Sequence, residues 1–202
     1  MIDKTTRLEK GVILLSAPFL NDIFKRSVIL LTEHNDEGSV GFIINKPSEY
    51  KLHEVVEDFP EFLAPVYVGG PIQQDTLNFI HRSSELSGGV EICDGIYWGG
   101  NFDNLKFNID TGIANPDDFR FILGYSGWGP GQLQGEFEHD SWYLSKTNSD
   151  FIFRNEPEDQ WSKALRKMGS KYAVFSTFPD DPRWNIPKEF SFSVFIETSA
   201  TL

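Results

Sequence analysis

The sequence is poor in cysteine, in basic residues and in long apolar runs. Its one cysteine, Cys93, excludes a disulfide within the chain, and there is no C-x-x-C motif for a metal or redox centre. A lone cysteine suits a reducing compartment, so we expect a cytoplasmic protein. No apolar run approaches the roughly 18 residues of a membrane-spanning helix. The apolar stretch at 11–17 is too short for a secretory signal and is followed by Pro18, so we expect no membrane association.

Basic residues are scarce relative to acidic ones. Lys and Arg number 18 against 30 Asp and Glu, which gives a net charge of -12. A protein that binds a nucleic-acid backbone needs a concentrated basic face. Here the basic residues are scattered, and their densest group, at 163–171, also fits the solvent face of a helix. We expect no direct binding to nucleic acid, and partners that are neutral or basic.

Apolar residues, by contrast, are sufficient for one core. The chain has 202 residues, 40% of them hydrophobic, and no repeat, low-complexity tract or linker divides it, so one domain is predicted. Strand patterns outnumber helices and do not alternate strictly with them, which favours an α+β domain with a mixed sheet. Strands are predicted at 12–16, 27–33, 40–44, 65–68, 76–81, 90–93, 96–98, 119–125, 141–144, 151–153 and 172–178.

Helices are predicted where apolar residues recur every three or four positions. This spacing occurs at 52–59, at 102–109 and most clearly at 155–169. The last helix has Asn155 and Glu158 at the spacing of a capping box and Gly169 at its end.

The densest glycine segment is G-Y-S-G-W-G-P-G-Q-L-Q-G-E-F at 124–137. An apolar run precedes it, and Leu133 and Phe137 follow at helical spacing, so the order is strand, tight turn and short helix. Such a turn presents backbone N–H groups at a sheet edge and can build a site, but it can equally be a structural corner. The geometric prediction is that Trp128, Gln132 and Glu136 meet at one edge of the sheet.

Two further turns follow strand ends, at Asn45 and at Gly69-Gly70-Pro71. Strand ends that converge are a common location for a ligand, so these turns and the glycine segment predict one cleft for a ligand or partner. A structural turn is the alternative for Asn45, and Glu136 either acts as a general base or fixes a turn. The candidate residues of this cleft are Asn45, Gly69, Gly70, Pro71, Trp128, Gly131, Gln132 and Glu136.

No catalytic residue, metal site or cofactor is predicted. Ser126 stands in a sequence similar to the G-x-S-x-G nucleophile elbow, but Trp128 occupies the position that requires a small residue. The histidines lack the spacing of metal ligands, and neither phosphate-binding glycine motif is present.

Several segments together resemble the AlgH/YqgE family, a bacterial group of poorly defined function. They occur in the family's order, cover roughly 8–185, and are G-V-I-L-L-S-A-P at 11–18, F-K-R-S-V-I-L-L-T-E-H at 24–34, G-S-V-G-F-I-I-N-K-P at 38–47, V-Y-V-G-G-P at 66–71, L-G-Y-S-G-W-G-P-G-Q-L at 123–133 and the helix at 161–169. The resemblance implies a single α+β domain whose branched sheet folds into a pseudo-barrel with flanking helices. It implies no established enzymatic activity and no known catalytic residues, and the family name derives from a proposed transcriptional regulator of alginate synthesis.

The resemblance places the domain at 1–185 and leaves a C-terminal extension at 186–202. Apolar and polar residues alternate in this extension, as in an edge strand, and a disordered tail is the alternative. The leading hypothesis is a monomeric or weakly homo-oligomeric regulator that acts through a protein partner or a small ligand. The alternatives are an enzyme or ligand-binding domain that uses the strand-end glycine turns, and a structural module that oligomerises through a sheet edge.

Overall fold

The computed structural model describes residues 6–178, and the extension predicted at 186–202 lies outside this part of the chain. The strands are β1 (Ile13–Ser16), β2 (Val28–Asn35), β3 (Gly38–Ile43), β4 (Pro47–Lys51), β5 (Pro65–Val68), β6 (Ile72–His81), β7 (Val90–Cys93), β8 (Ile96–Trp98), β9 (Phe119–Trp128) and β10 (Trp142–Ser145). The helices are α1 (Leu52–Val55), α2 (Phe102–Asp110), η1 (Pro116–Asp118), α3 (Gln132–Glu138), α4 (Ser149–Phe153), α5 (Pro157–Lys167), α6 (Ser170–Ala173) and η2 (Phe175–Thr177).

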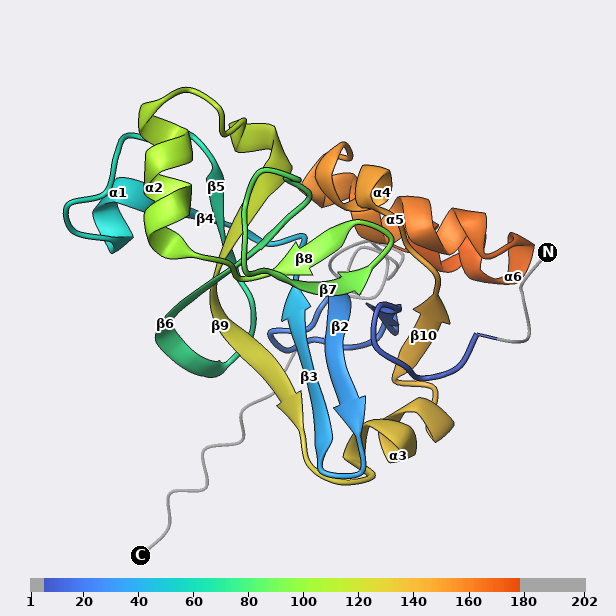
Figure 1. Cartoon of the computed structure of the whole chain (residues 1–202). Helices are drawn as coiled ribbons and strands as arrows, with labels where there is room; N and C mark the ends of the chain where they lie inside the picture. The colour runs from blue at the N-terminus through green and yellow to red at the C-terminus, as the bar shows by residue number, and fades with distance from the viewer. Residues whose placement is uncertain (1–5, 179–202) are drawn as a thin grey trace, which may run out of the picture.

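The strands form one ten-stranded sheet that forks at β9 (Figure 1). Its main order is β10-β1-β2-β3-β9-β6-β8-β7, and β4 and β5 branch from it. Along one edge of β9, the first half pairs in parallel with β5 and the second half pairs antiparallel with β3. The predicted α+β class and the mixed, branched sheet are confirmed. The described strands do not close into a barrel, because β10 and β7 end the order without pairing with each other.

Strand β9 separates two apolar clusters by the alternation of its side chains. Phe119 and Phe121 pack with α1, α2 and the β5 branch, whereas Ile122 packs on the opposite face with Trp161 and Leu165 of α5. A strand that is buried on both faces needs a nearly continuous apolar sequence, and F-R-F-I-L provides it except at Arg120. Helices α4 to α6 therefore cover one side of the sheet, and α2 covers the branch (Figure 1).

Two predicted strands are helices in the structure. Residues 151–153 form the end of α4, because the Asn148 side chain accepts a hydrogen bond of 2.8 Å from the backbone N–H of Phe151 and starts a helical turn. Residues 172–178 form parts of α6 and η2, where Tyr172 and Phe175 pack on the ring of Tyr143 at 5.0 and 5.8 Å. In both segments tertiary packing outweighs the strand preference of aromatic and β-branched residues.

Three predicted boundaries also need correction. The helix expected at 52–59 ends at Val55. Helix α5 begins after Glu156, with Pro157 in its first turn, and Asn155 does not cap it but donates to the carbonyl of Phe151 at 3.0 Å. Strand β9 continues through the first glycines to Trp128, so the tight turn is confined to 129–131.

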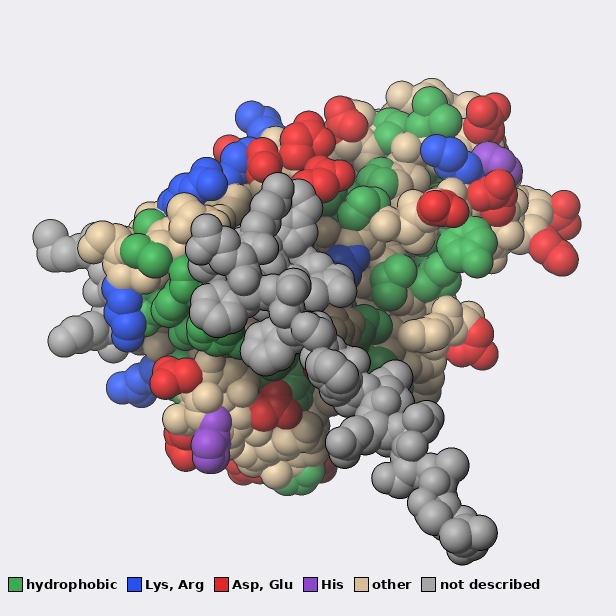
Figure 2. All heavy atoms as spheres, turned by 180° about the vertical axis from the view of Figure 1, so that it is seen from behind, with side chains coloured by type: hydrophobic (Ala, Val, Ile, Leu, Met, Phe, Trp, Pro, Cys, Tyr) green, Lys and Arg blue, Asp and Glu red, His purple; other side chains and the backbone are tan. Residues whose placement is uncertain are grey.

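The surface mixes charges of both signs. On the face seen in Figure 2, basic side chains lie in short groups beside acidic ones. None of the helices between residues 6 and 178 combines the length and the apolar character needed to cross a bilayer.

Candidate functional site

The predicted residues Asn45, Gly69, Gly70 and Pro71 lie at the fork of the sheet. Asn45 Oδ1 accepts a hydrogen bond of 2.7 Å from the N–H of Val28, and its Nδ2 donates to the carbonyl of Arg26 at 2.9 Å. The side chain therefore continues the pairing of β2 where β3 ends. Asn45 is used to join strands rather than to form a local turn.

Gly69 holds the two arms of the fork together. Its carbonyl accepts hydrogen bonds from the N–H of Ile43 at 2.9 Å and from Ser126 Oγ at 3.0 Å. A Cβ at Gly69 would collide with Ile122 and with the carbonyl of Gly124, and Gly70 has a φ of +154° against the backbone of Tyr125. Both glycines permit a close approach of backbones, and Pro71 follows them as an exposed residue.

The other predicted residues meet at the corner between β9 and α3. Trp128 Nε1 donates to Glu136 Oε2 at 2.9 Å, and Gln132 Nε2 donates to Glu136 Oε1 at 2.9 Å. Trp142 of β10 adds a third hydrogen bond, of 2.8 Å, to Glu136 Oε2. Gly131 has a φ of +70°, which allows the turn before α3. The carboxylate thus fixes this corner, and the structure brings Trp128, Gln132 and Glu136 together.

A hollow of about 360 Å³ lies beside this corner. It is lined by Trp128 and by residues of β2, β3 and the start of β6, but not by the other predicted site residues. That the fork and the corner bind one ligand or partner stays a prediction.

A larger hollow, of about 470 Å³, lies at the opposite end of β9, beside the connection between α4 and α5. We call it the arginine cleft. Its lining residues are Tyr67, Arg82, Asn115, Asp117, Arg120, Phe153, Arg154, Asn155, Glu156 and Pro157.

Arg120 is the most deeply buried charged residue of this cleft, with 3% of its surface exposed. Its guanidinium lies over the ring of Tyr67, 4.7 Å from the centroid, which is a favourable cation–π geometry. Nη1 donates to the carbonyl of Ile44 and is 3.5 Å from Gln160 Oε1. No carboxylate among residues 6–178 forms an ion pair with it.

The remaining nitrogens of Arg120, Nε and Nη2, donate to no acceptor within the described part of the chain. They are not among the enclosed polar atoms that lack a partner, so each keeps some accessible surface, and Arg120 lines the cleft. Burial lowers the pKa of Arg120, and the nearby Tyr67 and Glu156 oppose this effect. An arginine nonetheless stays protonated in proteins, so a positive charge lies at the base of the cleft.

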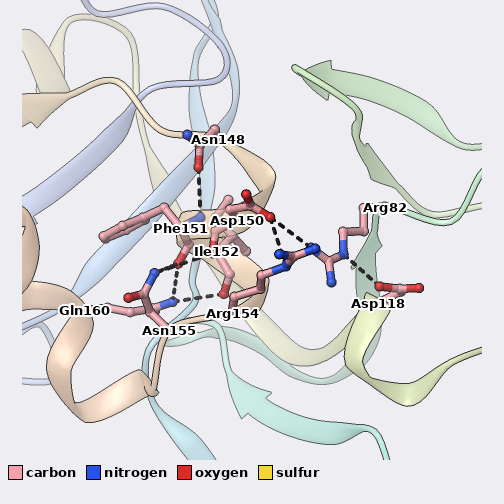
Figure 3. Close-up of polar contacts among 9 residues, drawn as sticks. All are labelled: Arg82, Asp118, Asn148, Asp150, Phe151, Ile152, Arg154, Asn155 and Gln160. Carbon is pink, nitrogen blue, oxygen red and sulfur yellow. Dashed lines mark hydrogen bonds and ion pairs between the residues drawn. The ribbon is translucent and has the colours of Figure 1, made fainter.

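The other two arginines of the cleft are already paired, as Figure 3 shows. Arg82 Nε lies 2.7 Å from Asp118 Oδ1, and its Nη1 lies 3.4 Å from Asp150 Oδ1. Arg154 also pairs with Asp150, at 3.0 Å. These ion pairs tie α4 to β6 and to the start of β9.

Two buried or half-buried amides hold the wall of the cleft rigid (Figure 3). Gln160 Nε2 donates to the carbonyls of Phe151 and Ile152 at 3.0 and 2.9 Å, and Asn155 Nδ2 donates to Phe151 at 3.0 Å. These hydrogen bonds satisfy the last carbonyls of α4 and tie the α4–α5 connection to α5 beside Arg120.

The chemistry available in the cleft is that of anion recognition. A guanidinium with unused N–H donors binds carboxylate or phosphate oxygens in a planar, directional way. Among residues 6–178, no group of three or more His, Cys, Asp or Glu side chains is arranged to hold a metal ion.

Arg120 is absent from the site predicted from the sequence. One signal for it exists: it is the only charged residue in the buried run F-R-F-I-L, and the next residue on its face of the strand, Ile122, is apolar. Its partners Tyr67, Ile44 and Gln160 come from distant parts of the chain, so the cleft itself has no local sequence pattern.

Comparison with known proteins gives consistent matches over the described domain. A family model described as AlgH-like matches residues 13–173. A protein of Chlorobium limicola named UPF0301 protein is 44% identical over 187 residues, which are 92% of this chain and 100% of that protein. A UPF0301 protein of Cytophaga hutchinsonii is 45% identical over 181 residues, 88% of this chain and 100% of that protein.

Solved structures share the fold. The solution structure of the AlgH protein from Pseudomonas aeruginosa has a TM-score of 0.66 and 28% identity, and the match covers 87% of this chain and 98% of that one. A crystal structure of a protein from Corynebacterium diphtheriae has a TM-score of 0.69 over 86% of this chain and 94% of that one, at 22% identity.

Proposed function

The chain belongs to the AlgH-like family, and from this premise we propose that it is a regulatory protein that binds a small anionic molecule in the arginine cleft. Regulation of transcription by such a protein would proceed through the bound ligand or a protein partner, not through direct contact with DNA. The net charge of -12 supports this choice, as do the mixed charges of the face in Figure 2, because a phosphate backbone requires a continuous basic face.

One observation carries the proposal: Arg120 is buried without an ion-pair partner in the described chain. Transferring a charge from water into a protein costs several kcal/mol unless it is compensated. Tyr67, the carbonyl of Ile44 and Gln160 compensate it in part. An anionic ligand would complete the compensation, and the unused donors Nε and Nη2 are available for it.

The corner at Glu136 supports a structural role more than a catalytic one. Both oxygens of this carboxylate accept hydrogen bonds from side chains, which commits the group to holding the corner together. This favours a binding function over an enzymatic one.

Isothermal titration with acetate and with inorganic phosphate tests the proposal. We expect at least one of the two to bind, and the variant Arg120→Met to weaken that binding by about tenfold or more, since a charged hydrogen-bonded pair is lost. Arg154→Met is the matched control, because this arginine lines the same cleft but has a side chain that is 68% exposed and paired with Asp150.

Arg120→Lys distinguishes the loss of the charge from a loss of folding. It retains the charge and should bind more weakly than the wild type but more tightly than Arg120→Met, while circular dichroism verifies that each variant is folded. Equal binding by Arg120→Met and Arg154→Met would contradict the proposal.

A further inference from the structure

This inference rests on the proposed function and specifies the class of ligand. We infer that the arginine cleft recognises a small zwitterion, which carries a carboxylate for Arg120 and an ammonium group for the acidic rim formed by Asp117 and Glu156. Free amino acids are the ligand class with this chemistry.

Some charged groups of the cleft form ion pairs and others do not. Arg82 and Arg154 are neutralised by Asp118 and Asp150. Arg120 has no carboxylate partner, and the carboxylates of Asp117 and Glu156 form no hydrogen bond or ion pair within residues 6–178. The uncompensated groups are therefore one enclosed cation and two rim anions.

The two kinds of uncompensated charge line one hollow from different elements. Asp117 belongs to η1 and Glu156 precedes α5, and both line the volume that reaches Arg120. Glu156 is near enough to Arg120 to raise its pKa electrostatically, yet it forms no ion pair with it. Because the two groups line one hollow without forming an ion pair, a ligand bound in it can contact both.

A ligand that carries only negative charge can pair with Arg120 but not with the rim carboxylates. Its charge would be attracted by Arg120 and repelled by both rim carboxylates, because like charges near one site oppose each other. An ammonium group on the same ligand converts that repulsion into attraction. Phosphate, with a higher negative charge than a carboxylate, would be repelled most.

Apolar contacts are also available for the rest of the ligand. Tyr67, Phe153 and Pro157 contribute aromatic and aliphatic surface to the same hollow. Its volume of about 470 Å³ accommodates a molecule of amino-acid size.

Paired ligands with and without the ammonium group test the inference by isothermal titration. The pairs are L-alanine with propionate, L-glutamate with glutarate, and L-phenylalanine with 3-phenylpropionate. In the wild type we expect at least one amino acid to bind about tenfold more tightly than its partner, which is one ion pair in a partly buried site.

The double variant Asp117→Asn/Glu156→Gln removes the rim charges without changing side-chain size. It should weaken binding of the amino acid about tenfold while binding of the matching carboxylate is unchanged or improved. Glu61→Gln, an exposed residue outside the cleft, is the control and should leave both affinities unchanged.

The outcomes separate the two proposals. If carboxylates bind through Arg120 as well as or better than their amino acids, the zwitterion inference is wrong and the anion-binding function stands. If the double variant weakens both members of a pair equally, the inference is also wrong. If no amino acid, carboxylate or phosphate binds, the proposed function itself fails.

Discussion

Trp128 and Glu136 are joined by a hydrogen bond of 2.9 Å across the turn that links β9 to α3. Trp142 donates to the same carboxylate oxygen, and the two indole rings pack edge to face with centroids 5.9 Å apart. Since both indoles are buried, Glu136 is the acceptor that allows two N–H groups to leave water.

Replacing Glu136 by Ala should therefore lower the free energy of unfolding by about 2–4 kcal/mol, because two buried donors lose their acceptor. Urea denaturation followed by tryptophan fluorescence measures this. Glu138→Ala, on the same helix but exposed, is the control and should cost less than about 0.5 kcal/mol. Equal effects of the two substitutions would show that the indole bonds contribute little.

Gln160 should stabilise the arginine cleft through its hydrogen bonds, as Glu136 stabilises the corner between β9 and α3. It is fully buried, donates to the carbonyls of Phe151 and Ile152, and lies beside Arg120. Gln160→Leu should reduce stability by about 1–3 kcal/mol in urea denaturation, because the carbonyl of Ile152 loses its side-chain donor and that of Phe151 keeps only Asn155.

Two measurements qualify the Gln160 result. Gln134→Leu is the control, since Gln134 is exposed and bonds only Glu138, and it should change stability by less than about 0.5 kcal/mol. In addition, hydrogen exchange of the 151–155 amides should rise in Gln160→Leu. Unchanged exchange there would mean that Gln160 does not hold the α4–α5 connection.

His81 should make stability depend on pH. Its ring is fully buried and stacked between Tyr97 and Phe119, and Nε2 donates to the carbonyl of Gly99 at 2.9 Å. Burial lowers the pKa of His81 below its ordinary value of 6.5, so the folded protein holds this ring neutral where the unfolded chain binds a proton. Stability should therefore fall as pH decreases below 6.5, until the pKa of the folded state is reached.

The contribution of one such proton is at most about 1.4 kcal/mol per pH unit. Urea denaturation between pH 7.5 and 5, a range that spans the ordinary histidine pKa of about 6.5, measures it. His81→Phe should reduce the slope of the unfolding free energy against pH by this amount. His53→Gln, at an exposed position, should leave that slope unchanged. An equal slope in His81→Phe and in the wild type would contradict this prediction.

The sequence predicts those parts of the fold in which local pattern and burial agree. The β2–β3 hairpin consists of two apolar runs around a polar turn, and β9 is an apolar run followed by glycines. The corner of Trp128, Gln132 and Glu136 is predictable because its members lie within one short segment, and a four-residue spacing fixes a shared helix face.

The remainder depends on contacts between distant segments. Phe151-Ile152-Phe153 has the composition of a strand, and only its packing against α5 and the cap from Asn148 make it a helix. The arginine cleft joins Tyr67, Arg120 and Glu156, which come from β5, β9 and the turn before α5. No spacing in the sequence reveals that these segments meet, because the fork of the sheet decides their positions.

Cys93 should be chemically inert in the folded protein. Burial and the neighbouring Asp94 and Glu91 raise the pKa of its thiol to about 11. Since the thiolate is the reactive form, its reaction with Ellman's reagent at pH 8 should be about a hundredfold slower than that of an exposed cysteine. A Cys93→Ser/Ser84→Cys variant supplies that reference at an exposed position, and urea should abolish the difference. Rapid labelling of native Cys93 would mean that the thiol is accessible.

Glycines Gly69 and Gly135 should respond in opposite ways to replacement by alanine. At Gly69 a Cβ would meet Ile122 and the carbonyl of Gly124, which are both fixed by the fork, so Gly69→Ala should cost about 2–4 kcal/mol through overpacking and backbone displacement. At Gly135, inside α3, a Cβ meets no atom within 4 Å. Gly135→Ala should therefore stabilise the protein by about 0.5–1 kcal/mol, since alanine loses less backbone entropy in a helix. Thermal unfolding monitored by circular dichroism compares the two variants directly. A stabilised Gly69→Ala would show that the fork can widen, and the close approach of β5 to β9 would then not be what requires glycine at this position.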